Sequence, residues 1–458
     1  MLIIEHSFVM FDVVVRSLAL SSYSEGSDSM SILTLNTALA GLLEKHIDEL
    51  VRKERLEPEV IKQGIENGTM VLLGNPEHPN VLPTLVGQPA SVKVNANIGT
   101  SPLKNDVRCE MVKLQTAINA GADTVMDLSI GGDLDAIRKE MISSTALPLG
   151  TVPMYAVAQT YLDSDRDPAD IDPEELFEEI EKQAQQGVDY MTVHCGLTMR
   201  GAQFATDGSR TMGIVSRGGS ILARWMLKNE KENPLLTGYD RILEIARKYN
   251  VTLSLGDGLR PGAGTDAGDA AQWEEVMVLG QLAKRGLEAG VQCMIEGPGH
   301  VPMSEVEAQI TSIKKLTNGA PLYVLGPLVI DSSPGYDHIS GAIGGAIAVK
   351  AGVDFLCYLT PAEHLTLPSI EDVHAGVIAS RIAAQAGEAT LGRPHALERE
   401  IGISRARKAL DWEGMKTLAL DPDMVEKRRE EHKDKRECAM CGKFCAYKMI
   451  EEDPQCSS

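Results

Sequence analysis

The chain lacks two features that would point to a membrane or to nucleic acid. No run of about 18 uncharged apolar residues occurs in it, so we expect no membrane span. It also has little positive charge, with 44 Lys and Arg against 65 Asp and Glu and a net charge of −21. Because a phosphate backbone is bound by clustered cations, this balance argues against a nucleic-acid partner. With 43% hydrophobic and 24% charged residues, the 458-residue chain has the composition of a globular enzyme.

A secretory signal and a disulfide framework are also missing. The first 20 residues are apolar, but they carry Glu5, Asp12 and Arg16 and have no basic leading segment. We therefore expect a poorly ordered extension over residues 1–30, with translation starting at Met1 or Met30. The chain is too long, and its eight cysteines too unevenly spaced, for a secreted disulfide scaffold. These features indicate a cytoplasmic protein with reduced thiols.

Short β-branched runs alternate with amphipathic stretches between about residues 90 and 385, which is typical of parallel βαβ units. The strand candidates are Val92–Asn97, Thr124–Leu128, Gly150–Tyr155, Tyr190–His194, Ile214–Val215, Thr252–Gly256, Gln292–Ile295, Leu322–Leu325 and Phe355–Leu359. The very short Ile214–Val215 is the candidate most easily read as a loop, which leaves the eight strands of a (β/α)8 barrel. A doubly wound open sheet is the rival fold. Polar or glycine-rich residues after nearly every strand favour the barrel, since its strands all open onto one face.

The chain divides into four zones by pattern. We expect the extension (1–30), a small N-terminal domain (31–90), an α/β, TIM-type (β/α)8 barrel that is the catalytic domain (91–386), and a helical C-terminal domain (387–458). The expected helices are Leu42–Arg55, Pro58–Asn67, Val107–Ala120, Pro173–Gln186, Ala271–Ala289, Ser304–Leu316 and Ile370–Ala386.

Three cysteines near the C-terminus form the sharpest motif. Cys438, Cys441 and Cys445 are spaced C-x2-C-x3-C, and soft thiolates on one tight loop suit an iron–sulfur cluster or zinc. A [4Fe–4S] cluster held by only three thiolates keeps one iron open for a small molecule such as S-adenosylmethionine. The alternative is a zinc knuckle completed by Cys456 or His432. Cys109, Cys195, Cys293 and Cys357 fall in barrel elements and are expected to be packing residues.

Histidines follow several of the predicted strands. His300 and His338 would both project onto the carboxyl face of the barrel, where two imidazoles can hold a divalent metal, either zinc or iron. Each of them alone is as easily a hydrogen-bonded structural residue. Glu296, near the same turn, could bind substrate or act as a base, and His194 is a third imidazole at a strand end.

Two glycine-rich loops are candidates for binding an anion and a sugar. Ser216, Arg217 and Gly218 precede a helical run, whose N–H groups could converge on a phosphate, although an ordinary tight turn would look the same. Asp257 in the second loop could accept two sugar hydroxyls, and Arg260 could add a bidentate donor.

Four further residues could contact a heterocyclic ring. Asn95 and Asn97 offer amide donors and acceptors, although Asn near Gly is also common turn chemistry. Tyr155 and Met126 could line the ring, and Met126 is otherwise a plain core residue. The residues together predict a phosphosugar-sized pocket on a barrel with an additional cysteine cluster, a combination that suggests radical chemistry.

Nine motifs in fixed order resemble the ThiC family of thiamin biosynthesis, from about residue 91 to 448. They are NANIGTS (95–101), ADTVMDLS (122–129), GTVPMY (150–155), IVSRGGS (214–220), LSLGDGLRPG (253–262), MIEGPGHVPM (294–303), PGYDHI (334–339), TPAEHL (360–365) and RKALDWEGM (407–415). The resemblance implies a radical S-adenosylmethionine enzyme that acts on 5-aminoimidazole ribotide. It also implies a homodimer in which the partner's cluster reaches into the barrel, and a reduced electron donor of the flavodoxin or ferredoxin type.

The same resemblance assigns roles residue by residue. The ribotide would be held by Asn95 or Asn97, Met126, Tyr155, His194, Ser216, Arg217, Gly218, Asp257, Gly258, Leu259, Arg260, Glu296 and Tyr323. His300 and His338 would hold the divalent metal, and Cys438, Cys441 and Cys445 the [4Fe–4S] cluster. Together with Glu296, the three cysteines would be the catalytic residues. A 5′-deoxyadenosyl radical would abstract a ribose hydrogen, and the ribotide would then rearrange.

Departures from the family pattern bear on the product. The cysteine spacing is one residue shorter than in long family members, and residues 73–79 replace the motif that usually precedes the barrel. Ala156 stands where Gln is common and Ile130 where Thr is usual, changes that we interpret as altering the pocket rim. They favour the paralogue that makes 5-hydroxybenzimidazole, the lower-ligand base of a cobamide (vitamin B12). The alternative product is 4-amino-5-hydroxymethyl-2-methylpyrimidine phosphate for thiamin.

Two other classes of protein are rivals to a radical enzyme: a metal-dependent hydrolase and a non-catalytic iron–sulfur carrier.

Overall fold

The computed structural model describes residues 30–438 and 440–451. The expectations for the extension at residues 1–29 and for Cys456 lie outside these described residues. Within the described ranges, no helix combines the length and apolarity needed to cross a membrane.

Eight parallel strands close into a barrel in which β10 pairs with β3, as the sequence predicts. They are β3 (Lys93–Ile98), β4 (Thr124–Asp127), β5 (Leu149–Thr151), β6 (Tyr190–Val193), β7 (Thr252–Leu255), β8 (Cys293–Glu296), β9 (Leu322–Leu325) and β10 (Phe355–Cys357). Ile214–Val215 forms no strand. The predicted strand Gly150–Tyr155 is wrong at its end, because Pro153 begins a helix and carries Tyr155 into its first turn.

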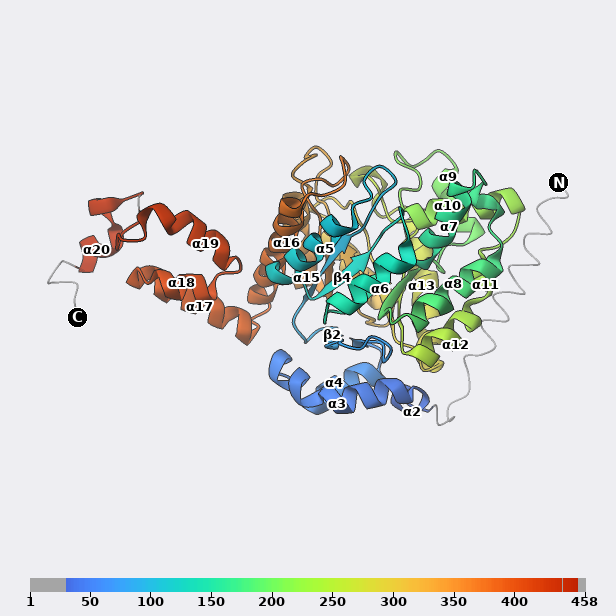
Figure 1. Ribbon diagram of the computed structural model, residues 1–458, viewed down its shortest axis with the longest axis horizontal. Coiled ribbons are helices and arrows are strands. Elements are labelled where there is room, and N and C mark those ends of the chain that lie inside the picture. Colours follow the sequence, from blue (N-terminus) through green and yellow to red (C-terminus); the bar gives the residue numbers. More distant parts are fainter. Residues whose placement is uncertain (1–29, 439, 452–458) are drawn as a thin grey trace.

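Helices surround the barrel (Figure 1). They are α5 (Val107–Ala120), α6 (Leu134–Ser144), α7 (Pro153–Asp163), α8 (Pro173–Gln185), α9 (Met199–Thr206), α10 (Arg217–Asn229), α11 (Pro234–Thr237), α12 (Tyr239–Tyr249), α13 (Ala270–Glu288), α14 (Val306–Leu316), α15 (Asp337–Ala351) and α16 (Ile370–Thr390). Side chains cap several of them: Asp106 accepts a backbone N–H of α5, and Asp269 accepts one of α13. Such caps satisfy N–H groups that the first turn leaves unpaired.

The N-terminal segment lies beneath the barrel in Figure 1 and closes the amino ends of the strands. It contains α2 (Ile32–Leu35), α3 (Thr37–Glu54), α4 (Pro58–Glu66) and a hairpin of β1 (Val71–Leu73) and β2 (Thr84–Val86), which the sequence analysis missed. Two buried pairs attach this segment: Glu54 lies 3.1 Å from Lys93, and His78 lies 2.8 Å from Asp189. The bottom of the barrel is therefore sealed, and the opposite face is left for chemistry.

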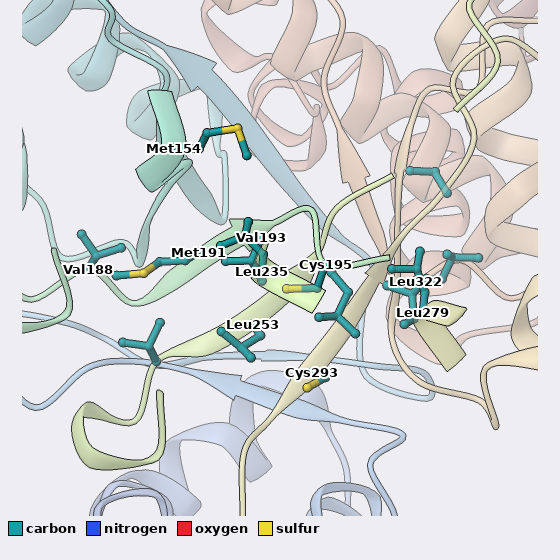
Figure 2. Packing of buried hydrophobic residues seen from close by; sticks show 14 of the residues in the cluster. Met154, Val188, Met191, Val193, Cys195, Leu235, Leu253, Leu279, Cys293 and Leu322 are labelled. Atoms are coloured by element: carbon teal, nitrogen blue, oxygen red, sulfur yellow. The ribbon is translucent and has the colours of Figure 1, made fainter. Parts of the chain in front are cut away.

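Hydrophobic side chains fill the space between the strands and the helices. Figure 2 shows Cys195 and Cys293 among Met191, Val193 and Leu253. Both thiols are buried in the core, as expected for packing residues.

The C-terminal segment extends away from the barrel (Figure 1). It comprises α17 (Pro394–Ala409), α18 (Trp412–Leu418), α19 (Pro422–Arg429) and α20 (Ala446–Glu451). Helix α16 joins it to the barrel and packs against α5 and α15.

Candidate active site

A cavity of about 100 Å³ lies inside the barrel at the carboxyl ends of its strands. Most of the residues that we assigned to the ribotide face it: Asn97, Met126, Tyr155, His194, Asp257, Arg260, Glu296 and Tyr323. Several of these residues lie on a barrel strand or directly after one, on β3, β4, β6, β8 and β9. The barrel thus collects residues from distant parts of the chain at one place, as this fold does in general.

The two asparagines of β3 have different environments. The Asn95 amide nitrogen donates to the Tyr323 hydroxyl at 2.7 Å and to the Asn97 Oδ1 at 2.7 Å. The Asn95 Oδ1 accepts from Thr124 Oγ1 at 2.8 Å, and Asn95 is fully buried. Both polar atoms of the Asn95 side-chain amide therefore have partners within the barrel, whereas Asn97 itself lines the cavity. Asn97 is therefore the asparagine placed to contact a substrate.

Glu296, at the end of β8, is held by two hydroxyl groups. Thr192 Oγ1 on β6 and Ser254 Oγ on β7 each donate to Glu296 Oε1 at 2.7 Å. Because Oε1 is occupied in this way, the carboxylate has a fixed orientation in the cavity wall. Its second oxygen remains available to a ligand.

Removing one of these hydroxyls should weaken catalysis without unfolding the barrel. Thr192→Val keeps the side-chain volume but leaves Glu296 with one donor, and a lost hydrogen bond to a charged group costs about 1.5–3 kcal/mol. We expect kcat/KM to fall about 10- to 100-fold, with circular dichroism unchanged. Thr160→Val on the exposed face of α7 is the matched control, since among the described residues its hydroxyl bonds only to the Ala156 carbonyl. Equal activity of Thr192→Val and the parent would contradict this role.

At the cavity wall, Arg260 Nη1 donates to Asp257 Oδ1 at 2.9 Å. Burial raises the pKa of Asp257 to about 8, although Arg260 acts in the opposite direction. Glu296 adds to the rise because it is a second carboxylate in the same cavity. Leu259 itself is fully buried in the core, so its side chain anchors the loop instead of lining the cavity.

The glycine-rich loop at residues 216–219 forms the start of α10. The Ser216 Oγ accepts the Gly219 N–H at 3.1 Å and caps the helix, and the first N–H groups of α10 are left for an anion. Arg217 lies over the ring of Tyr155, 4.8 Å from its centroid. None of Ser216, Arg217 and Gly218 lines the cavity itself, so the phosphate site at this loop stays a prediction.

His194 explains why Gly218 is a glycine. A Cβ at position 218 would lie 2.2 Å from the imidazole Cε1, and a Cβ at Gly256 would lie 2.9 Å from Cδ2. The ring fits between these two backbones, with its Nε2 3.3 Å from Ser216 Oγ. Among the described residues its buried Nδ1 has no hydrogen-bond partner, so a ligand in the cavity could supply one.

The same imidazole should give the protein a measurable acid sensitivity. Burial, with a smaller contribution from Arg260, lowers the pKa of His194 to about 3. Free histidine titrates near pH 6.5, so in the window between these values the unfolded chain binds a proton that the folded chain does not. The free energy of unfolding should therefore fall on acidification, by up to about 1.4 kcal/mol per pH unit. Denaturant titrations at several pH values from about 7 to 5 give the free energy of unfolding as a function of pH. Its slope should be smaller for His194→Gln than for the parent, and an unchanged slope would contradict the assignment of the acid sensitivity to His194.

The imidazole that faces His300 is His364, which the sequence analysis did not assign. The ring centroids of His300 and His364 are 5.3 Å apart. His300 Nδ1 lies 2.6 Å from Asp331, and His364 Nδ1 lies 3.0 Å from Asp337. Such carboxylates orient metal-binding histidines and leave the Nε2 atoms for an ion.

His338 lies elsewhere, which corrects its pairing with His300. It stands in the first turn of α15 and lines a second, largely apolar cavity with His374 and Met424. Burial lowers the pKa of His338. Within the described ranges, no three His, Cys, Asp or Glu side chains are arranged closely enough to hold an ion.

Cys357 lines the main cavity and is more than the packing residue that we expected. Its Sγ accepts from Asn97 Nδ2 at 3.1 Å at the end of β10. Burial raises the pKa of this thiol to about 12, so it remains protonated. Its position at the carboxyl end of a barrel strand is the signal in the sequence that could have identified it.

The three C-terminal cysteines lie close to one another in sequence but differ in exposure. Cys445 is buried, Cys438 is half-buried and Cys441 is exposed. Hydrogen bonds from the backbone of Cys441 and Met440 lower the pKa of Cys438. A stabilised thiolate is what a soft metal requires.

Arg429 and Trp412 bind backbone carbonyls in residues 432–437, the segment that leads to the three-cysteine motif. Arg429 lies 3.9 Å above the ring of Trp412 and donates to the carbonyls of His432, Lys435 and Glu437. The Trp412 indole donates to the Arg436 carbonyl at 2.9 Å. The backbone that leads to Cys438 is therefore held in place by these contacts.

The family model and the relatives found by sequence agree on one family. A family model described as Radical SAM ThiC family matches residues 33–452. A phosphomethylpyrimidine synthase of Thermoanaerobacter sp. (strain X514) is 49% identical over 420 residues, covering 91% of this chain and 97% of the relative. Phosphomethylpyrimidine synthase 2 of Syntrophotalea carbinolica is 47% identical over 422 residues, covering 91% and 98%. Among solved structures, a dihydropteroate synthase of Xanthomonas albilineans matches 71% of this chain and 100% of its own, with 14% identity and a TM-score of 0.40, too distant to bear on function.

Proposed function

Because the chain belongs to the radical S-adenosylmethionine ThiC family, we propose that this enzyme is a phosphomethylpyrimidine synthase. It would convert 5-aminoimidazole ribotide into 4-amino-5-hydroxymethyl-2-methylpyrimidine phosphate. The observation that carries the proposal is 47–49% identity, over nearly their whole length, to relatives that bear this name.

This proposal reverses the order in which the sequence analysis ranked the two products. The preference for 5-hydroxybenzimidazole rested partly on Ala156 and Ile130, which we interpreted as changes at the pocket rim. Neither residue lines the cavity. Ala156 instead faces an outer groove lined by residues of α6, α7 and α8. The two substitutions therefore give no support to a different product.

The cavity supports the binding of a phosphorylated, sugar-containing heterocycle. The N-terminus of α10 would receive the phosphate, with Arg217 as a charged donor. Asp257, with its pKa near 8, can both donate to and accept from sugar hydroxyls, and Arg260 keeps it oriented. Asn97 and Tyr155 would contact the heterocycle, and His194 would offer its unpaired Nδ1.

Two further groups belong to the proposal. His300 and His364 would hold a divalent metal, zinc or iron, since each has its Nδ1 fixed by an aspartate. Cys438, Cys441 and Cys445 would hold a [4Fe–4S] cluster, for which the lowered pKa of Cys438 prepares one ligand. When bound, the cluster supplies the electron that cleaves S-adenosylmethionine. We also propose a homodimer and a reduced donor of the flavodoxin or ferredoxin type.

The product can be identified directly. The anaerobically reconstituted protein is incubated with 5-aminoimidazole ribotide, S-adenosylmethionine and a chemical reductant, and the mixture is analysed by mass spectrometry. The proposal predicts the pyrimidine phosphate together with 5′-deoxyadenosine. Formation of 5-hydroxybenzimidazole would replace the proposal with the paralogous activity, and absence of both products would overturn it.

A further inference from the structure

A single residue behind the cavity, Leu259, is held through both of its backbone polar groups. The Leu259 N–H donates to Glu275 Oε2 at 2.7 Å, and the Leu259 carbonyl accepts from Arg210 Nη2 at 2.7 Å. Leu259 stands between Gly258 and Arg260, so the clamp fixes the loop that carries Asp257 and Arg260. Both clamping side chains are buried, Arg210 at 7% exposure and Glu275 at 2%.

Arg210 also reaches the segment that leads into the phosphate loop. Its Nη1 donates to the Gly213 carbonyl at 3.1 Å, three residues before Ser216. Its Nε and Nη2 bind the two oxygens of Asp269 at 2.6 and 2.8 Å. One guanidinium thus joins residue 213, residue 259 and the cap of α13. Its planar set of donors is suited to such a junction, and the single ammonium group of lysine is not.

The two loops touch directly as well. A Cβ at Gly219 would lie 2.2 Å from the Gly258 carbonyl oxygen, so the start of α10 and the Asp257 loop are in backbone contact. Asp266 supports the same junction, because its carboxylate accepts the N–H groups of Thr211 and Met212 at 2.8 and 2.9 Å. A shift of either loop would therefore change the distance between the phosphate site and the sugar site.

We propose that Arg210 is a positioning residue that sets the spacing between the phosphate loop at residues 216–219 and the sugar loop at residues 257–260. Glu275 assists by accepting the N–H of the same residue, Leu259. Neither side chain lines the cavity, so their effect on the ribotide passes through the backbone. This inference rests on the proposed function, since it concerns the binding of the same ribotide.

The test compares two buried arginines. Arg210→Met should raise KM for 5-aminoimidazole ribotide about 10- to 100-fold, because a misplaced binding loop of this kind loses affinity steeply. KM for S-adenosylmethionine should change less than about twofold. The control is Arg138→Met: Arg138 has 3% side-chain exposure and also bonds to a carboxylate, Asp135, but it lies on α6, outside the cavity. It should lower the melting temperature and leave both KM values unchanged.

Conservative variants keep the test informative if Arg210→Met does not fold. Arg210→Lys should retain the fold and still raise the ribotide KM. Glu275→Gln keeps a carbonyl oxygen for the Leu259 N–H, so of these variants it should change the ribotide KM least. Parent-like ribotide KM values in the folded Arg210 variants would overturn the inference, as would equal rises in both KM values. If the parent protein itself fails to bind 5-aminoimidazole ribotide in calorimetry, the proposed function fails instead, so the two failures are distinguishable.

Discussion

Cys441→Ala is expected to abolish both product formation and the release of 5′-deoxyadenosine. Removing one of three thiolates leaves Cys438 and Cys445 unable to hold a [4Fe–4S] cluster, since cysteine thiolates are its protein ligands. The loss should exceed the roughly 10- to 100-fold typical of removing an outer-shell partner of a metal site. Iron content and 5′-deoxyadenosine, measured on the same preparation, check this result.

Cys109→Ala serves as the matched control. Cys109 is half-buried on α5, its thiol forms no disulfide with another described cysteine, and it does not line the cavity. We expect this variant to keep its iron and its turnover. Turnover by Cys441→Ala that matches the parent would contradict the radical assignment and would favour the hydrolase that we considered as a rival.

His364→Gln is expected to lose the divalent metal, and His338→Gln is expected to keep it. His364 faces His300 across 5.3 Å between ring centroids, whereas His338 lines the separate apolar cavity beside α16. Glutamine has the approximate size of histidine but is a poor ligand for zinc or iron. Product formation should fall in His364→Gln by more than the roughly 10- to 100-fold that loss of a residue supporting a metal ligand costs.

Metal content after dialysis, measured by mass spectrometry, distinguishes the two variants. His300→Gln should behave as His364→Gln does. Retention of metal by His364→Gln with loss from His338→Gln would restore the pairing inferred from the sequence and contradict the pairing inferred from the structure.

The barrel could be predicted from the sequence because its signal is local and repeated. Most strands are short apolar runs with β-branched residues, and nearly every one is followed by polar or glycine-rich residues. The hairpin of β1 and β2 was missed because its three-residue strands are too short to show alternation. The loop assignment of Ile214–Val215 was sound because two residues cannot form a barrel strand.

The choice between neighbouring residues could not be made from the sequence. Asn95 and Asn97 have the same parity on β3 and point to the same side. Which of them reaches the cavity depends on the layers of the barrel interior, where Tyr190 and Tyr323 enclose Asn95. The spacing of residues along one strand contains no information about those partners.

The histidine pair illustrates the same limit. His338 follows a strand in sequence, but twelve residues separate it from Leu325, and it enters α15. His364 follows β10 closely and adopts a left-handed backbone conformation, with φ of 61°. Residues other than glycine adopt this conformation rarely, and here it belongs to the turn in which the His364 ring meets His300. A hydrophobicity pattern does not report such a turn.

The transfer of deuterium from substrate to cofactor tests the central claim most directly. The reconstituted protein is incubated with 5-aminoimidazole ribotide that carries deuterium on its ribose, together with unlabelled S-adenosylmethionine and reductant. If the cavity brings the ribose to the radical, the 5′-deoxyadenosine formed should gain deuterium while the pyrimidine phosphate accumulates. Pyrimidine phosphate formed alongside 5′-deoxyadenosine without deuterium, or formed with no 5′-deoxyadenosine at all, would contradict the account.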